Sequence, residues 1–229
     1  MSMTNFAEAC ATYRFLQEKG YPEKAALKLV GDRHRLSSIQ RNCIFRGVIA
    51  QPAAASRRAK IVGWETVTGQ PLGLDWYNVL ITVESYLRGQ ILFVGDDGMV
   101  RDASAAHGSY RPAAPTSRAI EEIVREIGRL QPSRVDAYLD TPIAFSGLMA
   151  EDLRLRLAQL PFASEVALAA SADYPLKRYA GIVASADSAV LDRSACVLDL
   201  ARSVLATRFD FNPPEIHELF PGSPGSPRQ

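Results

Sequence analysis

Apolar residues at helical spacing dominate the beginning of the chain. They recur three or four positions apart, which predicts short amphipathic helices over residues 6–19, 22–35 and 39–50. Gly20 suits the position after the first helix, because glycine readily takes the left-handed conformation found just beyond a helix end. The second and third helices have roughly helix-turn-helix proportions. We therefore expect a helical head, followed at residues 51–59 by a joint of Ala, Pro, Ser and Arg.

A different pattern begins at residue 72 and predicts a strand, a helix and a second strand in succession. Apolar residues alternate before Asp75, then fall at helical spacing, and then form a continuous run at residues 91–94. Acidic residues follow both predicted strands, Asp75 after the first and the pair Asp96 and Asp97 after the second.

The rest of the chain repeats this alternation of strand and helix. Further strands are predicted at residues 61–70 (as a strand or hairpin), 134–140, 165–170 and 181–187. Further helices are predicted at residues 117–131, capped by Thr116, and at 148–160 and 195–206. The expected fold class is α/β: a helical head over residues 1–58, a three-layer α/β domain with a mainly parallel sheet over 59–220, and a disordered tail at 221–229.

The aspartates at predicted strand ends are the main candidates for chemistry. Parallel strands present their carboxyl ends at one edge of a sheet, where ligands bind at the point of strand-order reversal. Carboxylates gathered there raise one another's pKa unless a cation lies between them, and hard oxygen ligands suit Mg²⁺ or Mn²⁺. Each acid alone would be an ordinary turn or cap residue. Together they predict a metal site formed by Asp75, Asp97, Asp140 and Asp187.

Other polar residues are candidates for supporting roles. Neighbouring strand residues point to opposite faces, so Asp96 and Asp102 are expected behind the metal ligands. Ser146 lies at a predicted helix start, where it could hold a phosphate oxygen or act as a plain N-cap. The irregular segment 102–115, which contains His107, is a candidate flap over the cleft.

Composition indicates an ordinary soluble protein. Of the 229 residues, 47% are hydrophobic and 22% charged, and the three cysteines lie far apart without a CxxC pair. No apolar run approaches the roughly 20 residues that a membrane-spanning helix requires. The first residues lack the layout of a signal peptide. We therefore expect a cytoplasmic location and no contact with a membrane.

Charge is distributed unevenly along the chain. Residues 1–60 hold 11 Lys and Arg against 4 Asp and Glu, whereas the remainder holds 15 against 21. One interpretation is a phosphate-contacting face that binds nucleic acid without reading its sequence. The other is a solvated surface, or arginines that dock on the acidic body. The candidate nucleic-acid-binding residues are Arg33, Arg35, Arg41 and Arg46.

Several segments together resemble an uncharacterised prokaryotic family. The segments are LDWYNVLITVES, DDGMVRD, LDTPIAFSG and ASADSAVLD, and the first part, KGYPEKAALKLVGDRHRLSSIQRNCIFRGV, resembles the domain of unknown function numbered four-three-four. The later part is similar to the PIN and NYN nuclease-like superfamily. This resemblance implies a PIN-like α/β fold in which Asp75, the nearby Asn78 and the late-motif Asp187 are catalytic. Where NYN-type proteins commonly carry two close acids, this chain has only Asp187, with the next acid at Asp192.

Two functions from different classes fit these features. The first is a metal-dependent phosphodiesterase that acts on RNA, or less readily on single-stranded DNA, with the basic head holding the polyanion. The second is a non-catalytic nucleic-acid-binding or regulatory adaptor on a nuclease-like fold. A phosphatase for a small substrate would leave the basic head without a role. Dinucleotide-binding, P-loop and α/β-hydrolase motifs are absent from the sequence. The oligomeric state is left open, a homo-oligomer included.

Overall fold

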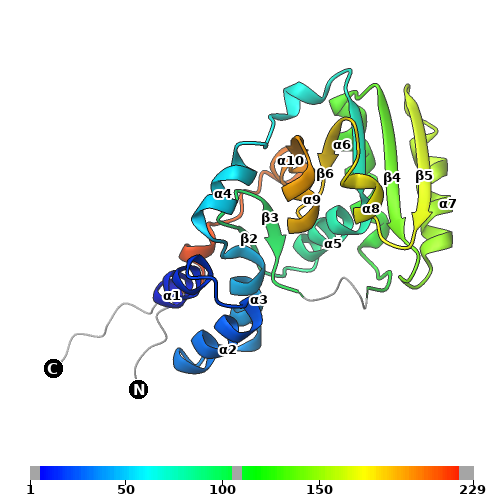
Figure 1. The fold of residues 1–229 in the computed structure, drawn as a ribbon. Coiled ribbons are helices and arrows are strands. Elements are labelled where there is room, and N and C mark those ends of the chain that lie inside the picture. The colour runs from blue at the N-terminus through cyan, green and yellow to red at the C-terminus, as the bar shows by residue number, and fades with distance from the viewer. Residues whose placement is uncertain (1–5, 105–109, 222–229) are drawn as a thin grey trace.

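The computed structural model describes residues 6–104 and 110–221. A helical head lies beside an α/β body, as Figure 1 shows. The predicted tail at 221–229, apart from its first residue, and the predicted flap residue His107 lie outside the described residues. Within the described part of the chain, no helix is both long enough and apolar enough to cross a membrane.

The head contains one helix more than the hydrophobic pattern predicts. Its helices are α1 Phe6–Glu18, α2 Glu23–Arg33, α3 Ser38–Gly47 and α4 Gln51–Arg58. The first three confirm the predicted helical region, and Ser37 caps α3 through a capping box with Gln40. The expected joint is instead α4. Pro52 lies in its first turn, where a missing N–H costs nothing, and the alanines that follow favour a helix.

A five-stranded sheet organises the body and confirms the expected α/β class. Its strands are β1 Pro71–Asp75, β4 Arg134–Asp140, β5 Ala163–Ala169, β6 Ile182–Ala184 and β7 Cys196–Leu198. Their order is β5-β4-β1-β6-β7, and all neighbours are parallel. The chain moves outward from β1 to β5 and then returns to the other side of β1 with β6. The strand order therefore reverses between β1 and β6, which is where ligands bind in open parallel sheets.

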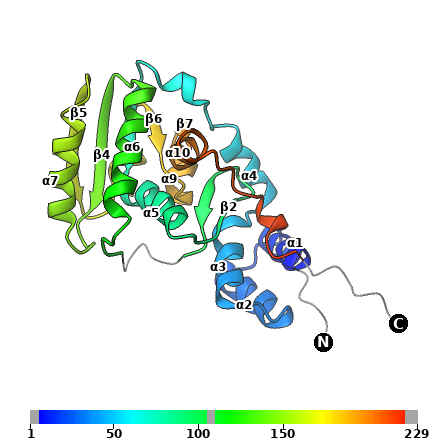
Figure 2. The same cartoon turned by 180° about the vertical axis from the view of Figure 1, so that it is seen from behind.

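Helices cover both faces of the sheet and complete three layers (Figure 2). One face packs against α5 Trp76–Leu87, α6 Thr116–Leu130, α7 Ser146–Leu157 and α10 Leu200–Phe209, which enclose the largest apolar core. The other face carries the short helices α8 Asp173–Leu176 and α9 Ser188–Arg193 over a smaller core. Helix α4 of the head contacts α9 on this second face.

The second predicted strand does not join the parallel sheet, and this corrects the sequence interpretation. Strand β2 Leu92–Val94 pairs antiparallel with β3 Val100–Asp102 in a separate two-stranded sheet. A tight turn joins them, in which Gly98 has a φ of +82°, a conformation that favours glycine. The Asp97-Gly98 dipeptide is a hairpin signal that could have revealed this turn. Asp96 and Asp97 therefore lie in a hairpin turn and not at the carboxyl edge of the parallel sheet.

Two further segments differ from prediction because their elements are very short. Residues 61–70 contain only the 3-10 turn Trp64–Val67 and a single parallel bridge from Ile61 to Val197. Residues 195–206, predicted as one helix, divide into β7 and α10. Asp199 caps α10 by accepting a hydrogen bond from the Arg202 backbone N–H. A strand of three residues is too short for its periodicity to be distinguished from that of a helix.

The hairpin packs into the head. Buried residues of α1, α2 and α3 share one apolar cluster with Phe93 of β2, with Ala103 and with Ile216, which begins the 3-10 turn Ile216–Glu218. Since apolar burial contributes roughly 25 cal/mol per Å², this shared core fixes the head against the hairpin.

Candidate functional site

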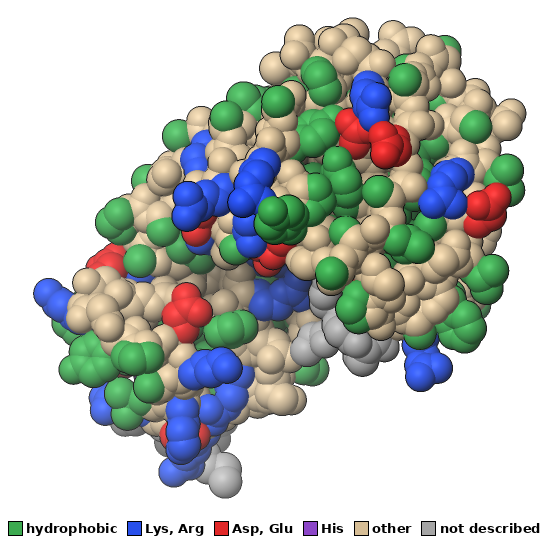
Figure 3. All heavy atoms as spheres, turned by 45° about the vertical axis from the view of Figure 1, so that its right-hand side comes forward, with side chains coloured by type: hydrophobic (Ala, Val, Ile, Leu, Met, Phe, Trp, Pro, Cys, Tyr) green, Lys and Arg blue, Asp and Glu red, His purple; other side chains and the backbone are tan. Residues whose placement is uncertain are grey.

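A cavity of about 810 Å³ opens where the head meets the carboxyl edge of the sheet. Figure 3 shows the surface hollowed between the two parts, with Lys and Arg side chains around the hollow. The body side of the cavity is lined by Asp75, Asn78, Arg101, Ser104, Asp173, Ala186, Asp187 and Ser188. The head side includes Tyr21, Glu23, Asn42, Phe45, Arg46 and Arg57. The cavity thus lies over the point where strand order reverses.

Asp75 ends β1 and is held by the neighbouring strand end. It caps α5 by accepting a hydrogen bond from the Asn78 N–H, and its Oδ2 accepts one from Ser185 Oγ at 2.8 Å. Asn78 Oδ1 in turn accepts the backbone N–H of Ala186 at 2.9 Å. Asp75 is 2% exposed. These bonds orient the Asp75 carboxylate at the reversal point, where the sequence predicted an acid.

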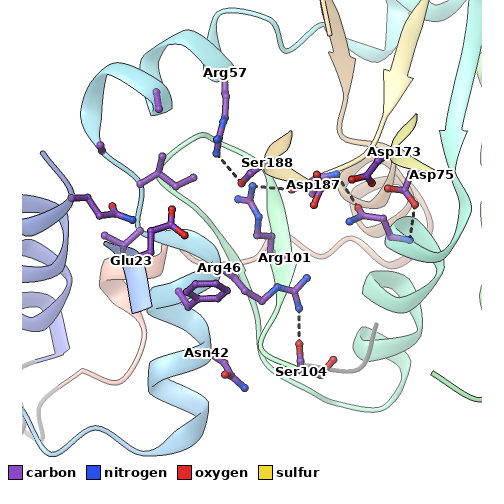
Figure 4. A pocket seen from close by; sticks show the side chains of 18 of the residues that line it. Glu23, Asn42, Arg46, Arg57, Asp75, Arg101, Ser104, Asp173, Asp187 and Ser188 are labelled. Atoms are coloured by element: carbon purple, nitrogen blue, oxygen red, sulfur yellow. Dashed lines mark hydrogen bonds between the residues drawn. The ribbon is translucent and has the colours of Figure 1, made fainter. Parts of the chain in front are cut away.

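Two further aspartates follow the ends of β5 and β6 and line the same cavity. Asp187 caps α9 through hydrogen bonds from Ala189 N and Val190 N at 2.8 and 3.1 Å. Asp173 begins α8 and pairs with Lys177 at 3.1 Å. Figure 4 shows Asp75, Asp173 and Asp187 grouped on one side of the cavity, with Arg46, Arg57 and Arg101 nearer to the head.

Asp97 forms ion pairs with two arginines and does not lie with the other predicted metal ligands. It is fully buried in the hairpin turn, and Arg101 binds its two oxygens at 2.7 and 2.8 Å. Arg57 approaches it at 3.4 Å. Burial by itself would raise the pKa of Asp97, but the Arg101 hydrogen bonds and charge outweigh it and lower the pKa. Arg101 also donates to the carbonyl of Ala186, which connects the hairpin to the end of β6.

Asp96 and Asp102, predicted to support the metal ligands, connect the hairpin to the head. Arg14 of α1 binds both oxygens of Asp96, the shortest contact being 2.7 Å. Arg46 of α3 donates to the Asp102 carboxylate at 3.0 Å and to the carbonyls of Asp102 and Ser104. Both acids therefore act in docking the two parts of the molecule.

Asp140 and Ser146 do not line the cavity. Asp140 ends β4 as predicted, and its Oδ1 accepts the backbone N–H of Ala172 at 3.0 Å. Ser146 begins α7, is 7% exposed, and donates its hydroxyl to the carbonyl of Thr141 at 3.2 Å. Of the four predicted metal ligands, the structure thus brings Asp75 and Asp187 to one cavity, without Asp97 or Asp140.

The predicted nucleic-acid-binding arginines fall into two pairs. Arg41 hydrogen-bonds Asp32 at 3.0 Å and the Leu36 carbonyl, and Arg46 contacts the hairpin as described. Arg33 and Arg35 are exposed on the head. Arg46 thus takes part in docking the head on the body, as one of the two interpretations of the head's charge expects, and it also lines the cavity.

Arg57, Asp173 and Ser185 are functional candidates that sequence reasoning missed. Arg57 contributes to the basic charge of residues 1–60, yet its side chain is 8% exposed and binds Asp192 at 2.7 and 3.0 Å and Ser188 Oγ at 2.9 Å. One sequence signal was available for Asp173: the tripeptide Ser-Ala-Asp occurs at residues 171–173 as well as at 185–187, after successive strands. No local sequence pattern identifies Arg57 as a site residue, because its hydrogen-bond partners Asp192 and Ser188 lie far away in the sequence.

The donor set decides which cation the cavity could hold. Within residues 6–104 and 110–221, no group of three or more His, Cys, Asp or Glu side chains is arranged to hold a metal ion. A closed cage of four carboxylates therefore does not fit. Two carboxylates do fit Mg²⁺, because this ion keeps several waters and is commonly bound by one or two carboxylates together with substrate phosphates. Asp75, Asp173 and Asp187 are the aspartates that line the cavity, and Asp75 and Asp187 are the two that the sequence predicted as ligands.

Comparisons with known proteins return families without a described activity. Residues 64–203 match the family described as "Domain of unknown function (DUF5616)", and residues 5–60 match "Protein of unknown function (DUF434)". The chain is also similar to "Uncharacterized protein MJ0935" of Methanocaldococcus jannaschii, with 26% identity over 179 residues that cover 78% of this chain and 85% of that protein. No solved structure matches the chain significantly. The expected resemblance to an uncharacterised family is confirmed.

Proposed function

The chain belongs to the family of the domain of unknown function DUF5616, and we propose that it is a metal-dependent phosphodiesterase that acts on RNA in preference to DNA. One observation carries this proposal. Asp75 and Asp187, at the ends of β1 and β6, flank the point of strand-order reversal and line the same cavity as Arg46, Arg57 and Arg101. Carboxylates for a cation and a guanidinium group for a phosphate, that of Arg46, thus face one space. The resemblance to PIN and NYN nuclease-like proteins supports the same fold and chemistry.

We propose that Asp75 and Asp187 hold one Mg²⁺ or Mn²⁺ ion, with Asp173 on the same wall. When bound, such an ion would supply an activated water and stabilise charge at the phosphorus. The chain orients Asp75 through Ser185 and Asn78, so the carboxylate is fixed before substrate arrives. Burial of Asp75 strengthens its attraction for a cation, since Coulomb energies grow as the local dielectric constant falls.

Arg46 is the arginine best suited to contact a phosphate. In the described part of the chain, all its hydrogen bonds to Asp102 and Ser104 come from one nitrogen, Nη1. Its Nε and Nη2 groups donate no hydrogen bond to the described residues, and Arg46 lines the cavity, so these donors are left for a phosphate there. Arg57, by contrast, uses Nε and both terminal nitrogens on Asp192, Ser188 and Asp97. Arg57 would act by holding α4 over the cavity.

Substitution of the cavity aspartates tests the proposal. We expect Asp75→Asn and Asp187→Asn each to lower the rate of Mn²⁺-dependent RNA cleavage by more than the roughly 10- to 100-fold that loss of an outer-shell partner costs. Mn²⁺ should raise the melting temperature of the wild type and not that of Asp75→Asn. Asp152→Asn, on the exposed surface of α7, is the matched control. Asp140→Asn should keep its activity, because Asp140 does not line the cavity.

A non-catalytic nucleic-acid-binding adaptor is the second candidate. The observation that favours it is the lack, among the described residues, of three grouped metal-binding side chains. In that case RNA would bind without cleavage in the presence of Mn²⁺, and the melting temperatures of wild type and Asp75→Asn would rise equally with the metal. Either result would rule out the phosphodiesterase.

A further inference from the structure

The head side of the cavity carries two exposed aromatic rings. Phe45 of α3 is 44% exposed and Tyr21, between α1 and α2, is 54% exposed, and both line the cavity. The large rings of the body near the same site, Trp76 and Tyr77, are fully buried. Rings left open on a recessed wall offer their faces to a ligand, because burying them in contact with one would be favourable.

Helix α3 presents three different groups to the cavity from one face. Asn42, Phe45 and Arg46 lie at positions i, i+3 and i+4, which are neighbours on a helix surface. They offer an amide, an aromatic face and a guanidinium group. These match a nucleotide's base edge, base face and phosphate respectively. Figure 4 shows Asn42 and Glu23 of the head across the cavity from Asp75.

We propose that Phe45, with Tyr21, is a stacking surface for unpaired bases and that the protein binds single-stranded nucleic acid. The inference rests on the proposed function and narrows its substrate class. The faces of bases are hidden within a double helix and become accessible to aromatic side chains only when the strand is unpaired. A base stacked on Phe45 leaves its phosphate beside Arg46, while the adjoining phosphodiester faces the aspartates across the cavity.

Binding of matched oligonucleotides tests this stacking. Fluorescence anisotropy would measure the affinity of the full chain for a labelled single-stranded RNA of about 12 nucleotides, the corresponding duplex, and an abasic strand of equal length. We expect the wild type to prefer the single strand over both others. Phe45→Ala should weaken single-strand binding about 5- to 150-fold, the range equivalent to loss of one stacked base. It should leave binding of the duplex and of the abasic strand unchanged.

Two further variants separate stacking from a general loss of structure. Phe45→Trp should bind the single strand at least as tightly as the wild type, because a larger ring stacks on bases equally well. Phe15→Ala is the matched control: Phe15 is 55% exposed on α1 of the same head but does not line the cavity. Its affinity for the single strand should equal that of the wild type.

Other results would overturn the inference. Equal affinity of Phe45→Ala and wild type for the single strand, equal losses on the abasic strand, or a wild-type preference for duplex would each do so. A change in oligomeric state of Phe45→Ala would assign the ring to contact with a second copy. Failure of the stacking proposal and failure of the proposed nuclease give different results. If binding depends on Phe45 and no cleavage occurs, the stacking surface is supported and the nuclease is excluded. If cleavage depends on Asp75 and Phe45→Ala leaves binding and cleavage intact, the nuclease is supported and the stacking surface is excluded.

Discussion

Asp199 is a buried carboxylate that combines a structural role with an unfavourable charge. Its Oδ1 accepts the Arg202 N–H at 2.9 Å to cap α10, and its Oδ2 accepts the Val100 N–H of β3 at 2.7 Å. Burial raises the pKa of Asp199 from 3.8 to about 6, although both backbone hydrogen bonds oppose the change. Asp199 thus connects the hairpin to the end of β7 at the cost of a desolvated carboxylate.

This raised pKa predicts a pH dependence of stability. Because the folded state binds the proton of Asp199 more tightly than the unfolded chain, this group favours folding at low pH, and the contribution is lost as pH rises through about 6. Asp199→Asn cannot titrate. The free energy of unfolding of wild type relative to Asp199→Asn should therefore increase by roughly 2 kcal/mol between pH 7 and pH 4. Urea unfolding across that range measures it, and a difference that stays constant with pH would contradict the assignment.

Residue type and strand-end position selected acids that line the cavity, but these two criteria could not distinguish them from acids that lie elsewhere. Asp75 and Asp187 line the cavity because β1 and β6 are central, adjacent strands of one sheet. Asp97 satisfied the same sequence criterion. It was misassigned because a continuous apolar run predicts a strand without specifying the sheet that the strand joins, and because the pairing with Arg101 depends on the hairpin.

At the scale of elements, Arg57 is the main connection between α4 and the body. Its guanidinium group lies 8% exposed between Asp192 of α9 and the fully buried Asp97 of the hairpin. Removing one partner of a buried ion pair leaves an uncompensated charge, which typically costs several kcal/mol. Here Arg101 still compensates Asp97, so the cost should lie toward the lower end of that range.

We expect Arg57→Ala to lower the free energy of unfolding by about 3 kcal/mol. Arg58→Ala is the matched control, since Arg58 is the next residue of α4, is exposed, and hydrogen-bonds only a backbone carbonyl, that of Asp96, among the described residues. Its effect should stay below about 1 kcal/mol. Denaturant unfolding of both variants measures the difference, and equal losses would show that α4 does not depend on the Arg57 connection.

Long periodic elements were predictable, whereas the pairing partners of several short strands were not. Helices α1, α5 and α6 and strands β1 and β4 follow from spacing alone, because each shows several repeats of its period. The three-residue strands β2, β3 and β7 show fewer than two repeats, so their partners are decided by tertiary packing. The prediction of a joint at the position of α4 was wrong for a different reason. Pro is compatible with the first turn of a helix as well as with an irregular connection.

At the scale of the molecule, the position of the head over the sheet edge could not be derived from local sequence. The contacts that fix it join distant parts of the chain: Arg57 and Asp192 are 135 positions apart, and Arg14 and Asp96 are 82 apart. Charge composition allowed this docking without deciding it, because a basic segment preceding an acidic body is compatible with docking as well as with binding of a polyanion. The structure uses part of the head's charge for docking, and Arg33 and Arg35 stay exposed.

This division of the head's charge leads to different expectations for the stability of its arginine variants. Exposed Arg33 and Arg35 can release counterions from a bound strand, whereas Arg46 also holds the hairpin. The double variant Arg33→Ala, Arg35→Ala should weaken single-strand binding and flatten the slope of log affinity against log salt by about 0.7 per lost phosphate contact, without changing stability. Arg46→Ala should also lower the free energy of unfolding, because it leaves the buried Asp102 without its arginine.

Anisotropy titrations at several salt concentrations, paired with denaturant unfolding, separate these effects. Arg125→Ala, on the exposed surface of α6 and outside the head, is the control and should keep the wild-type slope. If the double variant also kept that slope, the exposed head arginines would make no phosphate contact. Other groups of the protein, Arg46 in the cavity among them, would then have to make the phosphate contacts.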